Sequence, residues 1–325
     1  MMNRKYTQMM GERIRRWPAL VLAGVLAAGM MAVPVCAAEE ASEAVSEAVS
    51  EDAAEAVSEG AGAAEGLSEE EAQAVLDEVL DEVLDGADGT LAQVLEDGVI
   101  VIAMEGDWAP WSYHDEEDVL TGYDAEVARA IAGKLGVEAE LVEAPWESLF
   151  AGLDSGRYNL VVNGVDYTEE RAEKYDFSTP YAYNRTALIV RSDNNEITSF
   201  EDLEGKTTAN SISSTYMTLA ESYGAEATGV STLNETLQLV LSGRVDATLN
   251  AEVSYYDYMS VHPDAELKIA AIHEDVTNVC IPMAKGEENE SLLEAVNAAL
   301  DCLRADGTLS SLSEQFFGTD ISVND

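Results

Sequence analysis

An alternation of strand-like and helix-like segments that begins at Val99 constrains this fold more than any other feature of the sequence. The run VIVIAM at 99–104 has the composition of a buried strand. The segment 124–135 then places its apolar residues on one face of a helix that stops at Gly136. Strands that alternate with helices in this way predict an α/β fold with largely parallel sheets.

A second series of the same kind lies between residues 206 and 250. The folded part occupies about 235 residues, which favours two lobes over one. The segments 187–200 and 278–286, where buried strands run into polar turns, indicate the crossings between lobes. Because ligands of open α/β sheets bind beyond the carboxyl ends of strands, the cleft between the lobes is the expected site. The expected limits are 91–187 plus 280–325 for lobe 1, and 188–279 for lobe 2.

Residues 1–38 have the pattern of an export signal. Five basic residues precede an apolar, Ala-rich stretch at 17–35, which the sequence CAAEE follows. Cleavage after Ala37 or Ala38 would release a soluble protein, whereas Cys36 could instead carry a lipid. The valine directly before Cys36 favours simple cleavage. Either outcome predicts an extracellular or cell-envelope protein.

Residues 39–90 are strongly acidic, with 18 Asp and Glu residues and no Lys or Arg. A segment with this much like charge and no aromatic residue cannot bury enough surface to offset the entropy cost of ordering. We therefore expect an acidic stalk that is disordered over 39–66. The capping box of Ser68 and Glu71 and the repeated VLD predict a short helix at 68–85. Without an evident partner, this helix is expected to be solvated and partly frayed.

The formal net charge of −46 argues against binding to nucleic acid or to anionic lipid headgroups. His114, His262 and His273 are scattered without metal-ligand spacing, so neither a metal nor a cofactor is expected. Cys280 and Cys302 could form a disulfide in an exported protein, or could be small packing residues.

The run NGVDYTEERAEKYDFSTPY at 163–181 places a single arginine, Arg171, behind a small polar turn. Its planar guanidinium can offer a fork of donors to a carboxylate, which a lysine cannot match. The alternative is a surface arginine that pairs with Glu169 or Asp176.

This run resembles the signature of extracellular solute-binding proteins that deliver polar amino acids to ABC importers. The resemblance extends over roughly residues 95–320, and the sequence is most similar to the cystine-binding branch of the family. It implies a two-lobed periplasmic-binding-protein-like fold of type II, with two crossing strands joining the lobes. It also implies a small amino-acid ligand in the cleft and a membrane ABC permease as partner.

By the same resemblance, Arg171 holds the ligand α-carboxylate. Ser214 and Thr215, at the start of a helix in lobe 2, complete this site through free N–H groups and the helix dipole. The strand-end loops of lobe 1 bring further residues to the cleft, namely Glu105, Trp108, Trp111, Trp146, Asn163, Gly164 and Asp166.

The chain departs from the family pattern where an aspartate usually meets the ligand ammonium group. Ala251 occupies that position, between Asn250 and Glu252. A buried ammonium group needs a carboxylate partner, so Glu252, Glu105 and Asp166 are the candidates. Glu105 is favoured because it directly follows a strand that ends at the cleft.

The expected function is ligand binding by cleft closure, without catalysis, in a monomer. An exported enzyme on the same fold, such as a cyclohexadienyl dehydratase, is the alternative and would need a positioned general acid or base. A sensor domain of a membrane kinase is disfavoured because no membrane span precedes the end at Asp325.

Overall fold

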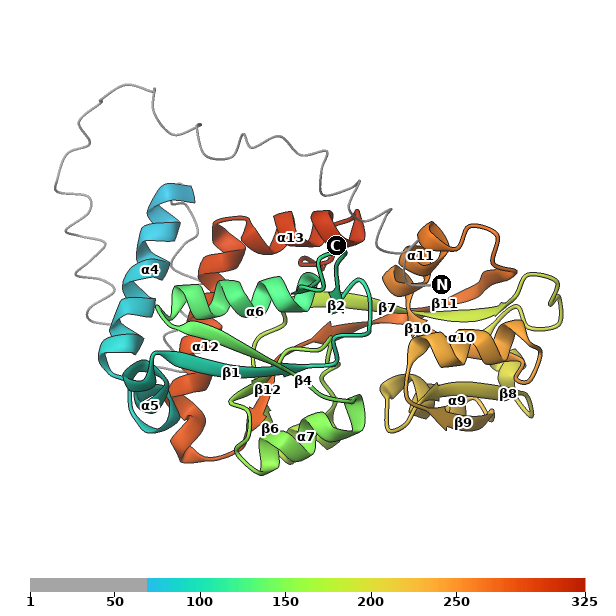
Figure 1. The fold of residues 1–325 in the computed structure, drawn as a ribbon, viewed down its shortest axis with the longest axis horizontal. Helices are drawn as coiled ribbons and strands as arrows, with labels where there is room; N and C mark the ends of the chain where they lie inside the picture. Colours follow the sequence, from blue (N-terminus) through green and yellow to red (C-terminus); the bar gives the residue numbers. More distant parts are fainter. Residues whose placement is uncertain (1–68, 325) are drawn as a thin grey trace, which may run out of the picture.

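The computed structural model describes residues 69–324 and has two lobes joined by two long strands (Figure 1). The expected export signal, Cys36 and the expected stalk over 39–66 lie outside the described residues. The predicted two-lobed α/β architecture is confirmed.

Lobe 1 is built on a parallel three-stranded sheet with the order β4-β1-β5. β1 pairs with β4 in parallel from Val99–Glu138 to Met104–Glu143. The strands are β1 (Val99–Met104), β4 (Glu138–Glu143) and β5 (Leu160–Val161), with two small antiparallel pairs, β2 (Tyr113–His114) with β3 (Leu120–Thr121) and β6 (Tyr175–Phe177) with β12 (Pro282–Ala284). The helical elements are α5 (Gly89–Asp97), α6 (Tyr123–Lys134), α7 (Trp146–Asp154), α8 (Glu169–Ala172), η2 (Glu287–Asn289), α12 (Glu290–Ala305) and α13 (Thr308–Phe317).

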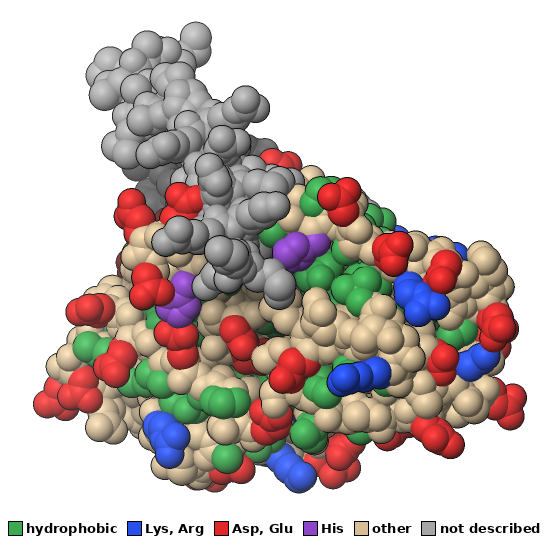
Figure 2. Space-filling view, turned by 45° about the vertical axis from the view of Figure 1, so that its right-hand side comes forward, with side chains coloured by type: hydrophobic (Ala, Val, Ile, Leu, Met, Phe, Trp, Pro, Cys, Tyr) green, Lys and Arg blue, Asp and Glu red, His purple; other side chains and the backbone are tan. Residues whose placement is uncertain are grey.

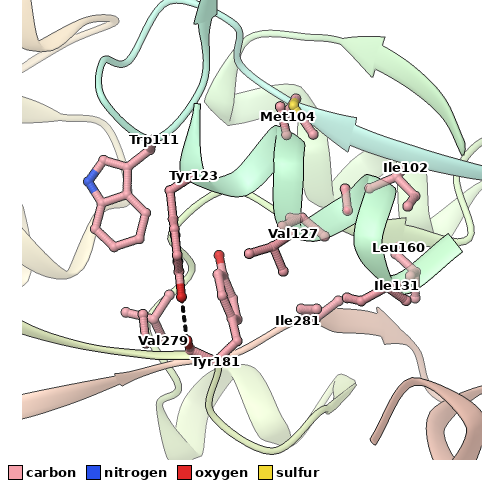
Figure 3. Close-up of a cluster of buried hydrophobic side chains, with 14 of the residues drawn as sticks. Ile102, Met104, Trp111, Tyr123, Val127, Ile131, Leu160, Tyr181, Val279 and Ile281 are labelled. Carbon is pink, nitrogen blue, oxygen red and sulfur yellow. Dashed lines mark hydrogen bonds between the residues drawn. The ribbon is translucent and has the colours of Figure 1, made fainter. Parts of the chain in front are cut away.

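An aromatic and aliphatic core fills lobe 1 (Figure 3). Tyr123 stacks on Tyr181 with ring centroids 5.9 Å apart. The Tyr123 hydroxyl donates to the Tyr181 backbone carbonyl at 2.8 Å. This hydrogen bond ties the start of α6 to the chain that leads into the first crossing strand.

Lobe 2 contains a five-stranded sheet with the order β11-β7-β10-β8-β9. Its strands are β7 (Ala182–Arg191), β8 (Thr207–Ser211), β9 (Glu226–Val230), β10 (Ala247–Ala251) and β11 (Leu267–Val279). Its helical elements are η1 (Phe200–Leu203), α9 (Thr215–Ser222), α10 (Leu233–Leu241) and α11 (Glu252–Val261). β8, β9 and β10 pair in parallel, whereas β7 is antiparallel to both β10 and β11. The expectation of largely parallel sheets therefore holds for the three-stranded sheet of lobe 1 and for β8, β9 and β10 of lobe 2. It does not hold for β7 and β11, because these two strands are the crossings and run in opposite directions.

The crossings are made by β7 and β11, which pair along almost their whole lengths. At the lobe 1 end, the Tyr183 backbone N–H donates to the Ile321 carbonyl at 2.7 Å. Further along, β7 residues Ala187 to Val190 pair with β10 in lobe 2. The expected boundary between residues 187 and 188 therefore falls inside β7, and the polar turn follows the crossing instead of forming it.

The acidic helix α4 (Glu69–Asp85) lies against lobe 1, at the end of the lobe remote from lobe 2 (Figure 1). Leu80 is only 5% exposed and belongs to the lobe 1 core, and Leu76 and Leu84 pack against this core. Asp77 also lies 3.9 Å from the Lys134 ammonium group. The sequence pattern predicts this helix correctly. The expectation that the helix lacks a partner is wrong, because its leucines lie along one face, which the acidic residues do not occupy, and this face packs against lobe 1.

Acidic side chains are scattered across the visible face of the molecule, as the net charge of −46 requires (Figure 2). Cys280 and Cys302 are buried free thiols, so they do not form the disulfide that the sequence would allow. Within residues 69–324, no helix combines the length and the apolarity needed to cross a bilayer.

Candidate ligand-binding site

A cavity lies between the lobes and encloses about 360 Å³ of free space, including its open mouth. Lobe 1 lines it from the ends of β1 and β5, from α7 and from α8, and lobe 2 lines it from the segment between β8 and α9. The lining residues are Glu105, Trp108, Trp146, Asn163, Gly164, Asp166, Arg171, Ser211, Ser214, Thr215 and Tyr216.

Arg171 reaches the cavity from α8, whose first turn is capped by the Thr168 hydroxyl. Its guanidinium donates to the Asp166 backbone carbonyl at 2.8 Å and lies over the Trp146 ring, 5.4 Å from the centroid. Burial lowers the pKa of Arg171 from its usual value. Among the described residues, no carboxylate forms an ion pair with this guanidinium within 4.0 Å.

The alternative of a paired surface arginine does not describe the geometry of Arg171. Asp176, one of the two expected partners, lies instead 3.8 Å from the Lys285 ammonium group. The charged guanidinium therefore has donors left for a carboxylate that enters the cavity.

The amino terminus of α9 faces Arg171 from lobe 2. The Ser214 hydroxyl caps this helix by accepting the Met217 backbone N–H at 3.1 Å. The first N–H groups of a helix have no partner within the helix, and the helix dipole makes this end attractive to anions. The Thr215 hydroxyl donates to the Asp166 carboxylate and so bridges the lobes.

Glu105 and Asn163 form a reciprocal pair at the ends of β1 and β5. The Glu105 backbone N–H donates to Asn163 Oδ1 at 2.7 Å, and Asn163 Nδ2 donates to Glu105 Oε2 at 2.8 Å. The pKa of Glu105 is raised to about 7, mainly by burial and also by the nearby carboxylates of Asp107, Glu147 and Asp124, while the hydrogen bond from Asn163 opposes the rise. Both polar atoms of Asn163 are thus used to hold Glu105.

Asp166 is a second acidic group in the cavity and is only 4% exposed. Burial raises the pKa of its carboxyl, although the nearby hydroxyl groups of Thr215 and Thr277 and the charge of Arg171 oppose the rise. Its Oδ2 accepts from Thr215, whereas its buried Oδ1 has no partner among the described residues.

Gly164 is required by the close approach of Trp108. Its φ of +53° lies in the left-handed region, and a Cβ at this position would come within 2.7 Å of the Trp108 ring. The Gly164 N–H donates to the Tyr181 hydroxyl at 3.1 Å, and this hydroxyl donates to the buried carboxylate of Asp124 at 2.7 Å.

Three residues expected at the site, Trp111, Asn250 and Glu252, do not line the cavity. Trp111 is fully buried in the lobe 1 core (Figure 3), stacked on Trp108, with its indole N–H donating to Ser254 at 3.2 Å. Because Trp111 lies in a polar loop, the sequence did not predict this packing.

The other two are held by lobe 2 itself. The Glu252 carboxylate is 2.9 Å from the Arg185 guanidinium on β7, which leaves it engaged at the start of α11. Asn250 is buried in β10 opposite Ala187. Neither therefore replaces the missing aspartate at Ala251.

Ser211 and Tyr216 line the cavity although neither was expected there. Ser211 ends β8, and Tyr216 is the second residue of α9, with its hydroxyl accepting from Asn184 Nδ2 at 3.1 Å. Both lie in the same loop-to-helix segment as Ser214 and Thr215, and this proximity in the sequence could have indicated that they line the cavity. Within residues 69–324, no group of His, Cys, Asp or Glu is arranged to hold a metal ion.

Residues 100–319 match the family described as bacterial extracellular solute-binding proteins, family 3. The chain belongs to this family. The solute-binding protein is 38% identical to the L-cystine-binding protein TcyA of Bacillus subtilis over 237 residues, which cover 72% of this chain and 87% of the relative.

Solved structures agree with this assignment. The L-cystine solute receptor of Neisseria gonorrhoeae, in its unliganded open conformation, is 39% identical and has a TM-score of 0.52, covering 73% of this chain and 100% of that chain. An ancestral arginine-binding protein bound to arginine is only 32% identical, yet it has a TM-score of 0.63 over 68% of this chain and 99% of that chain.

Proposed function

We propose that this protein captures an amino acid in the cavity between its lobes and delivers it to an ABC permease. The observation that carries the proposal is the unpaired Arg171 guanidinium, held opposite the amino terminus of α9. A ligand carboxylate at this place would receive the guanidinium donors and the helix N–H groups together. The ligand would thereby bridge the lobes and stabilise their closed arrangement.

The ligand ammonium group is assigned to the acidic side of the cavity. Glu105 is the favoured anchor, since it lines the cavity without an ion-pair partner among the described residues. Asp166, with its unpartnered Oδ1, is a second anchor. A buried ammonium group needs such a carboxylate, because an unpaired buried charge costs several kcal/mol.

L-Cystine is the proposed ligand, with another polar amino acid as the broader class. TcyA and the gonococcal receptor are both named for L-cystine, which carries two ammonium groups. Two carboxylates facing one guanidinium suit a ligand with more than one positive group. The acidic cavity and the names of these two relatives thus support the same ligand.

Binding without catalysis is the function we infer. The relatives reported above are binding proteins or receptors, and the cavity residues account for holding a zwitterion. An enzyme such as a cyclohexadienyl dehydratase would use a proton donor at the substrate, and Glu105, with a pKa of about 7, is the group that could serve. Conversion of a titrated ligand, followed by mass spectrometry, would reveal that activity.

We further propose that the protein acts outside the cytoplasmic membrane as a monomer, after removal of residues 1–38, or anchored through a lipid on Cys36. Family membership supports export. The amino-terminal residue of the mature protein, read by mass spectrometry, separates the two forms.

The test of the proposed site is the substitution Arg171→Ala. Loss of a charge-assisted buried pair typically costs about 3–5 kcal/mol, so affinity should fall by at least two orders of magnitude. Arg157→Ala removes an exposed arginine of lobe 1 and is the matched control, expected to bind normally. Calorimetric titration with L-cystine measures both. An Arg171→Ala variant that binds within a few-fold of the wild type would overturn the assignment.

A further inference from the structure

Several hydrogen bonds join the lobes directly across the cavity. The loop between β8 and α9 receives two of them from lobe 1. Trp146 Nε1 donates to the Ile212 carbonyl at 3.0 Å, and Arg171 Nη2 donates to the Ser213 carbonyl at 3.4 Å. A third contact joins Ser231 Oγ to Glu147 Oε1 at 3.4 Å. α7 and α9, which flank these contacts, lie at facing ends of the two lobes (Figure 1).

Trp146 is fixed in orientation by its neighbours in lobe 1. It is the first residue of α7, and the edge of its indole packs on Phe150 with ring centroids 5.7 Å apart and planes at 89°. The Arg171 guanidinium lies over the same indole, so a cation–π contact joins the two side chains. The indole therefore contacts Arg171 with its face and lobe 2 with its N–H.

The acceptor in lobe 2 is fixed as well. The Ile212 backbone N–H donates to the Val230 carbonyl at 3.3 Å, which holds this loop against β9. The Ile212 side chain lies over Gly229, where a Cβ would come within 2.5 Å of Ile212 Cγ1. Ser213 has a φ of +60°, which is uncommon for a residue other than glycine. This turn presents the carbonyls of Ile212 and Ser213 to lobe 1.

We propose that Trp146 is a positioning residue that latches the closed cleft, and that it couples the orientation of Arg171 to lobe closure. The proposal rests on the proposed function of the cavity. An incoming carboxylate can replace the Ser213 carbonyl as an acceptor for Arg171, whereas the bond from Trp146 to Ile212 remains. Opening the cleft must break that bond, so Trp146 controls how long a captured ligand stays.

The test is the substitution Trp146→Phe, which keeps an aromatic face for Arg171 and removes the N–H donor. A hydrogen bond of this kind is worth about a threefold to tenfold change in an equilibrium constant. Stopped-flow measurements with L-cystine should therefore show dissociation about threefold to tenfold faster, with the association rate changed less than about twofold. Ser231→Ala, which removes the longer contact between the lobes, is the control and should leave both rates within about twofold of wild type.

A purely structural role for Trp146 predicts a different result. It would lower the thermal stability of the ligand-free protein and change both rates, whereas the latch affects dissociation alone. An unchanged dissociation rate in Trp146→Phe, or an equal loss in the association rate, overturns the latch. If the wild type binds neither L-cystine nor any other amino acid, the proposed function fails instead.

Discussion

Individual residues of the cavity make its affinity depend on pH. The pKa of Glu105 is raised to about 7, mainly by burial, so a fraction of the free protein is protonated at neutral pH. An ammonium ligand favours the ionised carboxylate, so binding must release that proton. Affinity for L-cystine should therefore fall by up to about tenfold per pH unit below pH 7. Titrations between pH 5.5 and 8 measure this slope, and Glu105→Gln should bind more weakly and lose it. A variant that binds as tightly as wild type would remove Glu105 from the ammonium site.

The ligand-free protein has a pH dependence of the opposite sense. The buried carboxyl of Asp124 also has its pKa raised, from 3.8 to about 7, chiefly by burial. Between these values the folded state binds more protons than the unfolded state, so the free energy of unfolding should decrease as pH rises from about 4 to 7. Asp124→Asn, which can still accept from Tyr181, should flatten this decrease in urea-unfolding experiments. A decrease of the same size in the variant would contradict the assignment.

Gly164 offers a test of local geometry. Alanine at this position would adopt an unfavourable φ and would also contact the Trp108 ring, so Gly164→Ala should destabilise the protein by about 1–3 kcal/mol and weaken binding. Gly156 has a φ of +65° and open space within 4 Å of the position that a Cβ would occupy, so Gly156→Ala is the matched control for the backbone effect alone. Equal unfolding midpoints for the two variants would show that the contact with Trp108 has no effect.

At the scale of single elements, α4 is part of lobe 1. Leu80 is 5% exposed in the lobe 1 core, so Leu80→Ala should lower the free energy of unfolding by about 2–3 kcal/mol. Glu82→Ala, on the exposed side of the same helix, should change it by less than about 0.5 kcal/mol. Chemical denaturation measures both, and a neutral Leu80→Ala would show that the helix does not contribute to the fold.

The elements also show what the sequence could predict. The strands and helices of both lobes follow from local hydrophobic patterns, and the turn that carries Arg171 follows from its polar residues. The docking of α4 could not be predicted in the same way, because it depends on packing against α12, which lies more than 200 residues further along the chain. The same limit applies to Trp111 and Glu252. The partner of Trp111, Ser254, lies 143 residues further along the chain, and the partner of Glu252, Arg185, lies on β7.

At the scale of the whole molecule, the two lobes meet through a few specific contacts and enclose a cavity between acidic and cationic groups. The strands β7 and β11 are the only continuous connections between the lobes within the described residues 69–324. Closure around a ligand thus requires movement about these strands, with the bulges of β11 between Ile269 and Val276 as the irregular part of the crossing.

Whether the cavity captures an amino acid is decided by calorimetric titration of the processed wild-type protein with L-cystine and, separately, with each of the twenty standard amino acids. We expect saturable binding with one site per chain for L-cystine or for another polar amino acid, and no binding of apolar amino acids at comparable affinity. An absence of binding for every compound, in a protein shown to be folded, would refute the proposed function.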